Sequence, residues 1–137
     1  MERYMDFKQR QETEFNAFPK GFAFNNEQLK EEMAKLGVKS KDELTSIGYG
    51  GFIRKKDKEA YKALLVKQAK EKAAYLSVFE QLKDAIRYEL GNHEYCVTMD
   101  MDDALYAVGL SWDDLANDPL KAKACREARD EYMAQYR

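Results

Sequence analysis

The chain has 137 residues, a formal net charge of −2, two prolines and seven glycines. With 45% hydrophobic and 35% charged residues, it falls outside the disordered and fibrous classes and is long enough to bury a core. The first residues are charged and no run of 18 apolar residues occurs, so we expect a cytoplasmic protein without a membrane span. We expect a single domain over residues 1–137, with two lobes as the outer limit.

The first third of the chain predicts helices separated by a short extended segment. Aromatic residues recur at steps of three and four within residues 1–18, which is the spacing of one helix face. Residues 22–24 are a candidate strand. Asn25 or Asn26 can then accept the free amide hydrogens at the start of a helix, and Gly37 can take the left-handed conformation that ends it.

Residues 47–53 contain three glycines within four positions. Each glycine inside a helix costs about 1 kcal/mol relative to alanine, so this segment predicts a tight turn with short strands around it. The glycines fit neither the phosphate-binding loop nor the dinucleotide-binding fingerprint, which need a different spacing. We therefore expect a structural turn here.

The longest predicted element is one helix over residues 58–90. Asp57 can cap it, no Gly or Pro interrupts it, and its apolar residues alternate steps of four and three. At about 1.5 Å per residue, such a helix would be close to 50 Å long. That length exceeds a compact globule of this size, so we expect the helix to kink, protrude or bridge two lobes, with residues 67–72 as the exposed or bending part.

The C-terminal part predicts one more strand and several short helices. Residues 95–98 are rich in β-formers, Asp100 can cap a helix, and Pro119 suits the first turn of a last helix that ends near Gln135. The predicted fold class is α+β and mainly helical. It has one long central helix, several short helices and a small β-sheet with strands near residues 22–24, 47–53 and 95–98.

His93 and Cys96 are the residues that come closest to a reaction centre. Together with Cys125 they offer three soft ligands, whereas a structural zinc site needs four. No second group is placed to orient His93 as a base, and no oxyanion hole is indicated. We therefore predict a protein without metal, cofactor or catalytic residues, and keep an enzyme centred on His93 and Cys96 as the third hypothesis.

Charge is distributed unevenly along the chain. Residues 54–72 carry eight basic and three acidic side chains, whereas residues 94–118 carry seven acidic side chains and no Lys or Arg. One interpretation is that both regions are solvated faces or attract each other within the molecule. The other is functional, because an acidic surface can bind the basic groove of another protein by mimicking nucleic-acid phosphates. The predicted partner-binding residues are Asp100, Asp102, Asp103, Trp112, Asp113 and Asp114.

The basic region supports an alternative function. Its side chains can contact phosphates, and Tyr61 lies nearby in the sequence to stack on a base. This alternative predicts a nucleic-acid-binding accessory factor that uses Arg54, Lys55, Lys56, Lys58 and Lys62. The apolar ends of the long helix could also pair with a second copy and form a homodimer.

Two parts of the sequence carry a resemblance. The first is FAFNNEQLKEE over residues 22–32 with IGYGGFIR over residues 47–54, and the second is LGNHEYC over residues 90–96 with residues 103–105 and 109–110. They are similar to small uncharacterised proteins of bacteriophages and conjugative or other mobile elements. The resemblance implies an accessory protein that binds host machinery, as anti-CRISPR proteins bind defence nucleases, and it assigns no catalytic residue. We therefore expect a non-enzymatic inhibitor of a host protein that acts through its acidic surface in the host cytoplasm.

Overall fold

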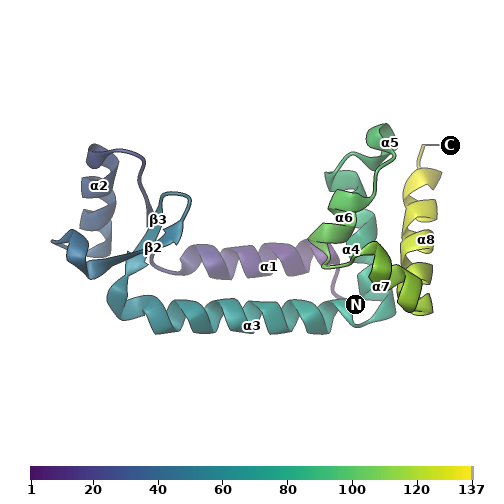
Figure 1. The fold of residues 1–137 in the computed structure, drawn as a ribbon, viewed down its shortest axis with the longest axis horizontal. Coiled ribbons are helices and arrows are strands. Elements are labelled where there is room, and N and C mark those ends of the chain that lie inside the picture. Colours follow the sequence, from purple (N-terminus) through teal and green to yellow (C-terminus); the bar gives the residue numbers. More distant parts are fainter. Residues whose placement is uncertain (137) are drawn as a thin grey trace. The chain divides into compact units, whose positions relative to one another are not determined.

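The computed structural model describes residues 1–136 (Figure 1). Within this range the chain forms eight α-helices, two short 3₁₀ turns and one three-stranded antiparallel sheet, so the predicted α+β, mainly helical class is confirmed. The chain divides into two compact units: residues 1–10 with residues 70 onward (unit 1), and residues 11–69 (unit 2). None of the described helices is long and apolar enough to cross a membrane.

The sheet belongs to unit 2 and has the strand order β1-β3-β2 (Figure 1). Strand β1 (Gly21–Phe22) pairs with β3 (Gly51–Arg54), and β2 (Leu44–Gly48) pairs with the other edge of β3. The strand expected near residues 22–24 is thus two residues long and begins one residue earlier. The segment expected near residues 47–53 is a hairpin of two strands, because Gly48 and Gly50 adopt the positive φ that reverses the chain.

Helix α2 (Asn26–Leu36) covers this sheet, and its ends are the ones that the sequence predicts. The Asn25 side chain accepts a hydrogen bond from the amide of Gln28, and Gly37 ends the helix in the left-handed conformation. The helix packs through a small apolar cluster against the sheet. The buried members of that cluster are Leu36, Val38 and Phe52.

Helices α1 (Tyr4–Ala17) and α3 (Lys58–Leu76) each run from one unit into the other. Within unit 2 they are joined by a reciprocal pair of side-chain amides. Gln11 Nε2 donates to the carbonyl of Gln68 at 2.9 Å, and Gln68 Nε2 donates to the carbonyl of Gln11 at 2.8 Å. These two bonds connect the helices within unit 2, beside the ring contacts that Tyr61 of α3 makes with Phe15 of α1.

The single helix expected over residues 58–90 is two helices, and the chain bends after residue 76 and not at residues 67–72, which lie within α3 (Lys58–Leu76). Helix α3 ends at Leu76, and α4 (Phe79–Asn92) begins after a two-residue break. At the break, the Ser77 hydroxyl donates to the carbonyl of Ala74 at 2.6 Å, and Val78 has an extended backbone. The hydroxyl competes for a carbonyl that a continuing helix would need, which lets the chain change direction.

Helix α4 lies at the centre of unit 1 and packs along α8 (Pro119–Ala134). Three alanines with no exposed surface, Ala85, Ala124 and Ala128, come from these two helices. Small side chains let the two backbones approach closely. The rest of the unit 1 core includes the buried side chains of Ile86, Leu90, Leu105 and Tyr132.

The strand expected near residues 95–98 is wrong as well. These residues form a single helical turn, α5 (Tyr95–Thr98), between Glu94 and Met99, which both have positive φ. Tyr95 is buried, with its ring centroid 6.1 Å from that of Tyr132. A β-forming composition produces a strand only beside a partner strand, and the described sheet is built from residues 21–54.

Candidate partner-binding surface

Two short helices of unit 1 present most of the predicted acidic residues. Asp102 and Asp103 occupy the first turn of α6 (Asp102–Ala107), and Asp113 and Asp114 occupy the first turn of α7 (Trp112–Asn117). Carboxylates are favourable at this end of a helix because they offset the positive end of the helix dipole. The local sequence therefore places the aspartates that we predicted for partner binding near the starts of α6 and α7.

Trp112 links these two helices through a single hydrogen bond. Its indole Nε1 donates to Oδ1 of Asp102 at 2.7 Å, while 55% of the residue remains exposed. An indole in the core would be fully covered by neighbouring side chains. Trp112 is instead a surface aromatic whose orientation is set by one of the predicted carboxylates.

Asp114 has a different role from the other predicted aspartates. Its carboxylate accepts a hydrogen bond from the Ser111 amide at 2.9 Å, and the Ser111 hydroxyl accepts one from the Asp114 amide at 3.1 Å. These bonds with Ser111 lower the pKa of the Asp114 carboxyl. Asp114 is half-buried and caps α7, so it contributes less of its charge to solvent than Asp113 does.

Tyr106 is an exposed residue of this region that sequence reasoning missed. It follows Asp102 by four residues and Asp103 by three on α6, which places all three on one helix face. With 85% of its surface exposed, it adds a second aromatic side chain beside the carboxylates. The spacing of three and four residues from the two aspartates could have indicated from the sequence that Tyr106 lies beside them.

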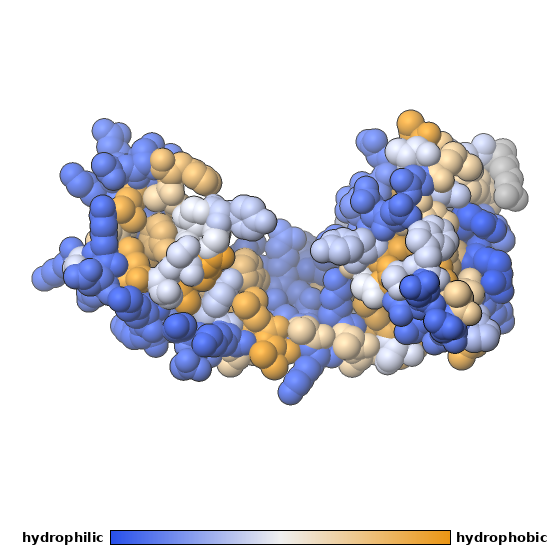
Figure 2. Space-filling view, in the orientation of Figure 1, coloured by the Kyte–Doolittle hydropathy of each residue, from blue (hydrophilic) through white to orange (hydrophobic). Residues whose placement is uncertain are grey.

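We call this region the acidic surface. Figure 2 shows hydrophilic residues over α6 and α7, with residues of intermediate hydropathy between them. Asp100 joins it through its carboxylate, which accepts a hydrogen bond from the Asp102 amide at 2.9 Å. The members are the exposed residues Asp100, Asp102, Asp103, Tyr106, Trp112 and Asp113.

The predicted basic residues lie in unit 2, around the start of α3. Arg54 is used within the fold, because its Nε donates to Asp57 at 2.7 Å and its Nη1 donates to the carbonyl of Leu36 at 3.2 Å. Lys62 lies 3.8 Å from Glu59, at the long end of ion-pair distances. The remaining predicted cations, Lys55, Lys56 and Lys58, have exposed side chains.

Tyr61, which the sequence offers for stacking on a base, makes ring contacts within unit 2. Its ring packs against Phe18 with a centroid distance of 5.4 Å and against Phe15 at 6.3 Å. The side chain is half-buried between α1 and α3. Its aromatic surface is therefore used to hold two helices together within unit 2.

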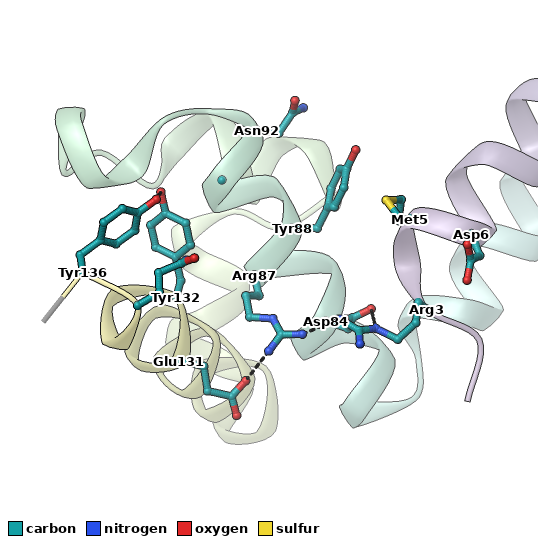
Figure 3. A pocket seen from close by; sticks show the side chains of 12 residues that line it. Arg3, Met5, Asp6, Asp84, Arg87, Tyr88, Asn92, Glu131, Tyr132 and Tyr136 are labelled. Atoms are coloured by element: carbon teal, nitrogen blue, oxygen red, sulfur yellow. Dashed lines mark hydrogen bonds and ion pairs between the residues drawn. The ribbon is translucent and has the colours of Figure 1, made fainter.

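Unit 1 also contains a cavity of about 810 Å³, lined by α4, α8 and the start of α1 (Figure 3). Four of its charged side chains are paired with one another. Asp84 accepts from Arg3 Nη2 at 2.8 Å and from Arg87 Nη2 at 3.0 Å, and Arg87 Nη1 lies 3.5 Å from Glu131. Burial disfavours the charge on Asp84, but the Arg3 guanidinium and the Tyr4 amide lower the pKa of its carboxyl.

Next to this cavity, Glu89 forms the most deeply buried ionic contact of unit 1. Only 1% of the residue is exposed, and its carboxylate accepts hydrogen bonds from Lys8 Nζ at 2.9 Å and from the Tyr4 hydroxyl at 3.1 Å. Burial opposes its ionisation, whereas Lys8 and Asn92 lower the pKa of the carboxyl. These bonds connect the first turns of α1 to α4.

His93 and Cys96 have separate surroundings. His93 Nε2 lies 3.3 Å from the buried carboxylate of Glu89. The Cys96 amide donates to the Tyr132 hydroxyl at 3.4 Å, and hydrogen bonding to the hydroxyls of Tyr132 and Tyr136 lowers the pKa of the Cys96 thiol. Within residues 1–136, no three His, Cys, Asp or Glu residues are grouped so that they could hold a metal ion.

A family model matches residues 3–131, which is nearly the whole chain. The chain belongs to DUF7659, a family of unknown function. No curated protein and no solved structure matches this member of DUF7659. The family description names no activity and no biological origin, so the acidic surface and the basic residues have to be judged on their own geometry.

Proposed function

We propose that this DUF7659 protein is a non-enzymatic interaction module that binds a basic surface of another protein through the acidic surface. The observation that carries the proposal is the contact between Trp112 and Asp102. It holds an exposed indole in one orientation among exposed carboxylates. Tryptophan is among the residue types that dominate binding energy at protein interfaces.

The two components of the acidic surface would act at different stages of binding. The carboxylates attract a basic partner over a distance of about one Debye length, which raises the association rate. Trp112 and Tyr106 then supply apolar contact area at a low cost in side-chain entropy. Since the Asp102 hydrogen bond already orients Trp112, less freedom is lost when the partner binds.

The partner that fits this chemistry is a protein with a basic groove, such as a nuclease that handles nucleic acids. Aspartates spaced along α6 and α7 would occupy positions that phosphates otherwise take. The resemblance to phage and mobile-element proteins supports a host defence nuclease in the host cytoplasm as the target. Inhibition, as by anti-CRISPR proteins, is the outcome that we propose.

A charge-reversal experiment tests this proposal. The double variant Asp103→Lys/Asp113→Lys changes two exposed members that have no capping role, and Glu12→Lys/Glu31→Lys makes the same change in net charge within unit 2. Wild-type protein immobilised on a resin should retain a specific host protein, and inhibit its activity, whereas the Asp103/Asp113 variant should do neither. Circular dichroism checks that both variants stay helical.

The outcomes are distinguishable. If the unit 2 control loses the same partner to the same extent, then net charge and not the acidic surface is responsible. If the Asp103/Asp113 variant still retains and inhibits the partner, the acidic surface is not the binding site. Sedimentation of the wild-type protein, measured separately, shows whether a homodimer forms.

A second candidate function, nucleic-acid binding, is favoured by one observation. Lys58 is the first residue of α3, and Lys55 and Lys56 lie in the 3₁₀ turn directly before it, where positive charge opposes the helix dipole. Each such charge is unfavourable by several tenths of a kcal/mol in the free protein. A bound polyanion would turn this arrangement into a favourable one.

A further inference from the structure

Three aromatic side chains of unit 2 are exposed around the turn of the β2–β3 hairpin. The exposed fractions are 46% for Phe22, 80% for Phe24 and 98% for Tyr49. Phe22 ends strand β1, Phe24 follows it, and Tyr49 lies in the turn itself. Aromatic residues of this size are normally buried, so three at one end of a small sheet indicate an interaction surface.

Two glycines bring the phenylalanine rings onto this turn. A Cβ atom on Gly50 would lie 2.7 Å from Cε1 of Phe24, and a Cβ atom on Gly51 would lie 2.8 Å from Cε1 of Phe22. The Ala23 amide also donates to the carbonyl of Gly50 at 3.0 Å, which fixes the segment beside the hairpin. Both rings thus lie against the backbone next to Tyr49 and keep their outer surfaces exposed.

The backbone of Tyr49 adds an independent observation. Its φ is +53°, in the left-handed region, which costs a residue with a side chain about 1–2 kcal/mol. A ring that is 98% exposed recovers almost none of this cost by packing. Asparagine or glycine would be more favourable for folding at this position, so the tyrosine points to a role outside the fold.

Strand β3 connects this aromatic group to the exposed lysines. It runs from Gly51 to Arg54, and the 3₁₀ turn that contains Lys55 and Lys56 follows directly. At about 3.3 Å per residue, Gly51 and Lys55 are about 13 Å apart. Exposed aromatic faces and exposed lysine side chains thus occur at the two ends of one strand within unit 2.

We propose that this part of unit 2 binds single-stranded nucleic acid, with bases stacked on Phe22, Phe24 and Tyr49 and phosphates contacted by Lys55, Lys56 and Lys58. Every base offers a π-face, so stacking tolerates any sequence. A duplex hides these faces between its base pairs, which is why the single strand is the expected form. The aromatic residues alone would also suit an apolar surface of another protein. The positive charge of the lysines favours a polyanion instead.

Fluorescence anisotropy with labelled single strands tests the proposal. A short oligothymidylate and a short oligouridylate should both bind in low salt. Comparing their affinities shows whether the protein prefers DNA or RNA. Three phosphate contacts predict a loss of affinity of about 20-fold between about 50 mM and about 200 mM salt. A blunt duplex of the same length should bind more weakly than either single strand.

Variants at the turn test the role of the aromatic residues. Tyr49→Asn removes the ring but suits the left-handed backbone, so the fold should persist while affinity falls by about 5- to 150-fold, the range found for one stacked base. Tyr49→Phe keeps the ring and should bind as the wild type does. Tyr136→Asn removes an exposed tyrosine from unit 1 and should have no effect.

Three results would overturn the proposal: no complex with either single strand at low salt, tighter binding to the duplex, or unchanged affinity in Tyr49→Asn. The Asp103→Lys/Asp113→Lys variant should still bind the single strands. The experiments can therefore reject the nucleic-acid site without rejecting the proposal for the acidic surface, and the reverse.

Discussion

The indole of Trp112 donates a 2.7 Å hydrogen bond to the carboxylate of Asp102, ten residues earlier in the chain. This bond joins the starts of α6 and α7 at the surface of unit 1. It restrains the indole, so that the same face of the Trp112 ring stays exposed on the acidic surface. Its effect on the mobility of the ring can be followed by fluorescence, since Trp112 is the single tryptophan of the chain.

Replacing Asp102 by alanine should release the indole. We expect Trp112 fluorescence to become more accessible to acrylamide, with a lower anisotropy and a loss of stability below about 1 kcal/mol, because the bond is exposed to solvent. Asp103→Ala is the matched control, since its carboxylate does not contact Trp112. Equal quenching of Trp112 in wild type and Asp102→Ala would show that the bond does not restrain the ring in solution.

Replacing Glu89 by alanine should destabilise unit 1 by about 3 kcal/mol. The change removes a buried carboxylate and leaves the Tyr4 hydroxyl and the Lys8 ammonium without this partner. The urea unfolding midpoint measures the loss. The control is Glu94→Ala, which removes an exposed glutamate five residues later in the chain. It should change stability by less than about 0.5 kcal/mol. Similar losses in both variants would contradict the role of Glu89 as an anchor.

Stability should depend on the protonation of Asp84 and Glu89. The pKa of each carboxyl is lower in the folded protein than the usual 3.8 for Asp and 4.5 for Glu, despite the opposing effect of burial. Their contribution to stability is therefore complete above these unfolded values and is lost as the pH falls through the lowered folded values. Urea unfolding at a series of pH values should show a decline that begins below about pH 4.5.

The Arg3→Ala variant checks which contact lowers the pKa of Asp84. Without the guanidinium, the folded-state pKa of Asp84 should rise toward its ordinary value, so less stability remains to be lost in acid. The variant should be less stable than the wild type near neutral pH, and the difference should shrink as Asp84 becomes protonated. A difference that stays constant from neutral pH to pH 3 would exclude this linkage.

Two glycines should respond in opposite ways to substitution by alanine. Gly50→Ala adds a Cβ atom 2.7 Å from the Phe24 ring at a φ of +78°, so we expect a loss of about 1–2 kcal/mol. Gly91→Ala lies in helix α4, and its Cβ atom would be 3.6 Å from Tyr132, an ordinary contact distance. Alanine is the better helix former, so this variant should gain up to about 1 kcal/mol. Thermal unfolding measures both changes, and the same sign for both would contradict the argument.

Helix ends were predictable where a local hydrogen bond defines them. The side chain of Asn25 caps α2, and Gly37 ends it in the left-handed conformation. Each of these features depends on residues no more than four positions apart. Their energies are therefore already set by the local sequence.

The break between α3 and α4 was not predictable in the same way. The apolar period continues from Tyr75 through Phe79 to Leu82 without Gly or Pro, which is the pattern of one helix. The chain nevertheless turns at Ser77, because ending the helix lets α4 bury Leu82 and Ile86 in the unit 1 core. The gain from burying that face exceeds the cost of breaking one helix, and it depends on residues far away in the sequence.

The candidate site shows the same division. The sequence alone determined that acidic residues gather at the starts of α6 and α7, because charges near a helix terminus follow from local preferences. Only the tertiary structure decided that Trp112 meets Asp102 and that the Phe24 ring lies against Gly50. Local hydrogen bonds and charges are properties of neighbouring residues. Contacts between distant segments depend on how the whole core packs, and no short stretch of sequence contains that information.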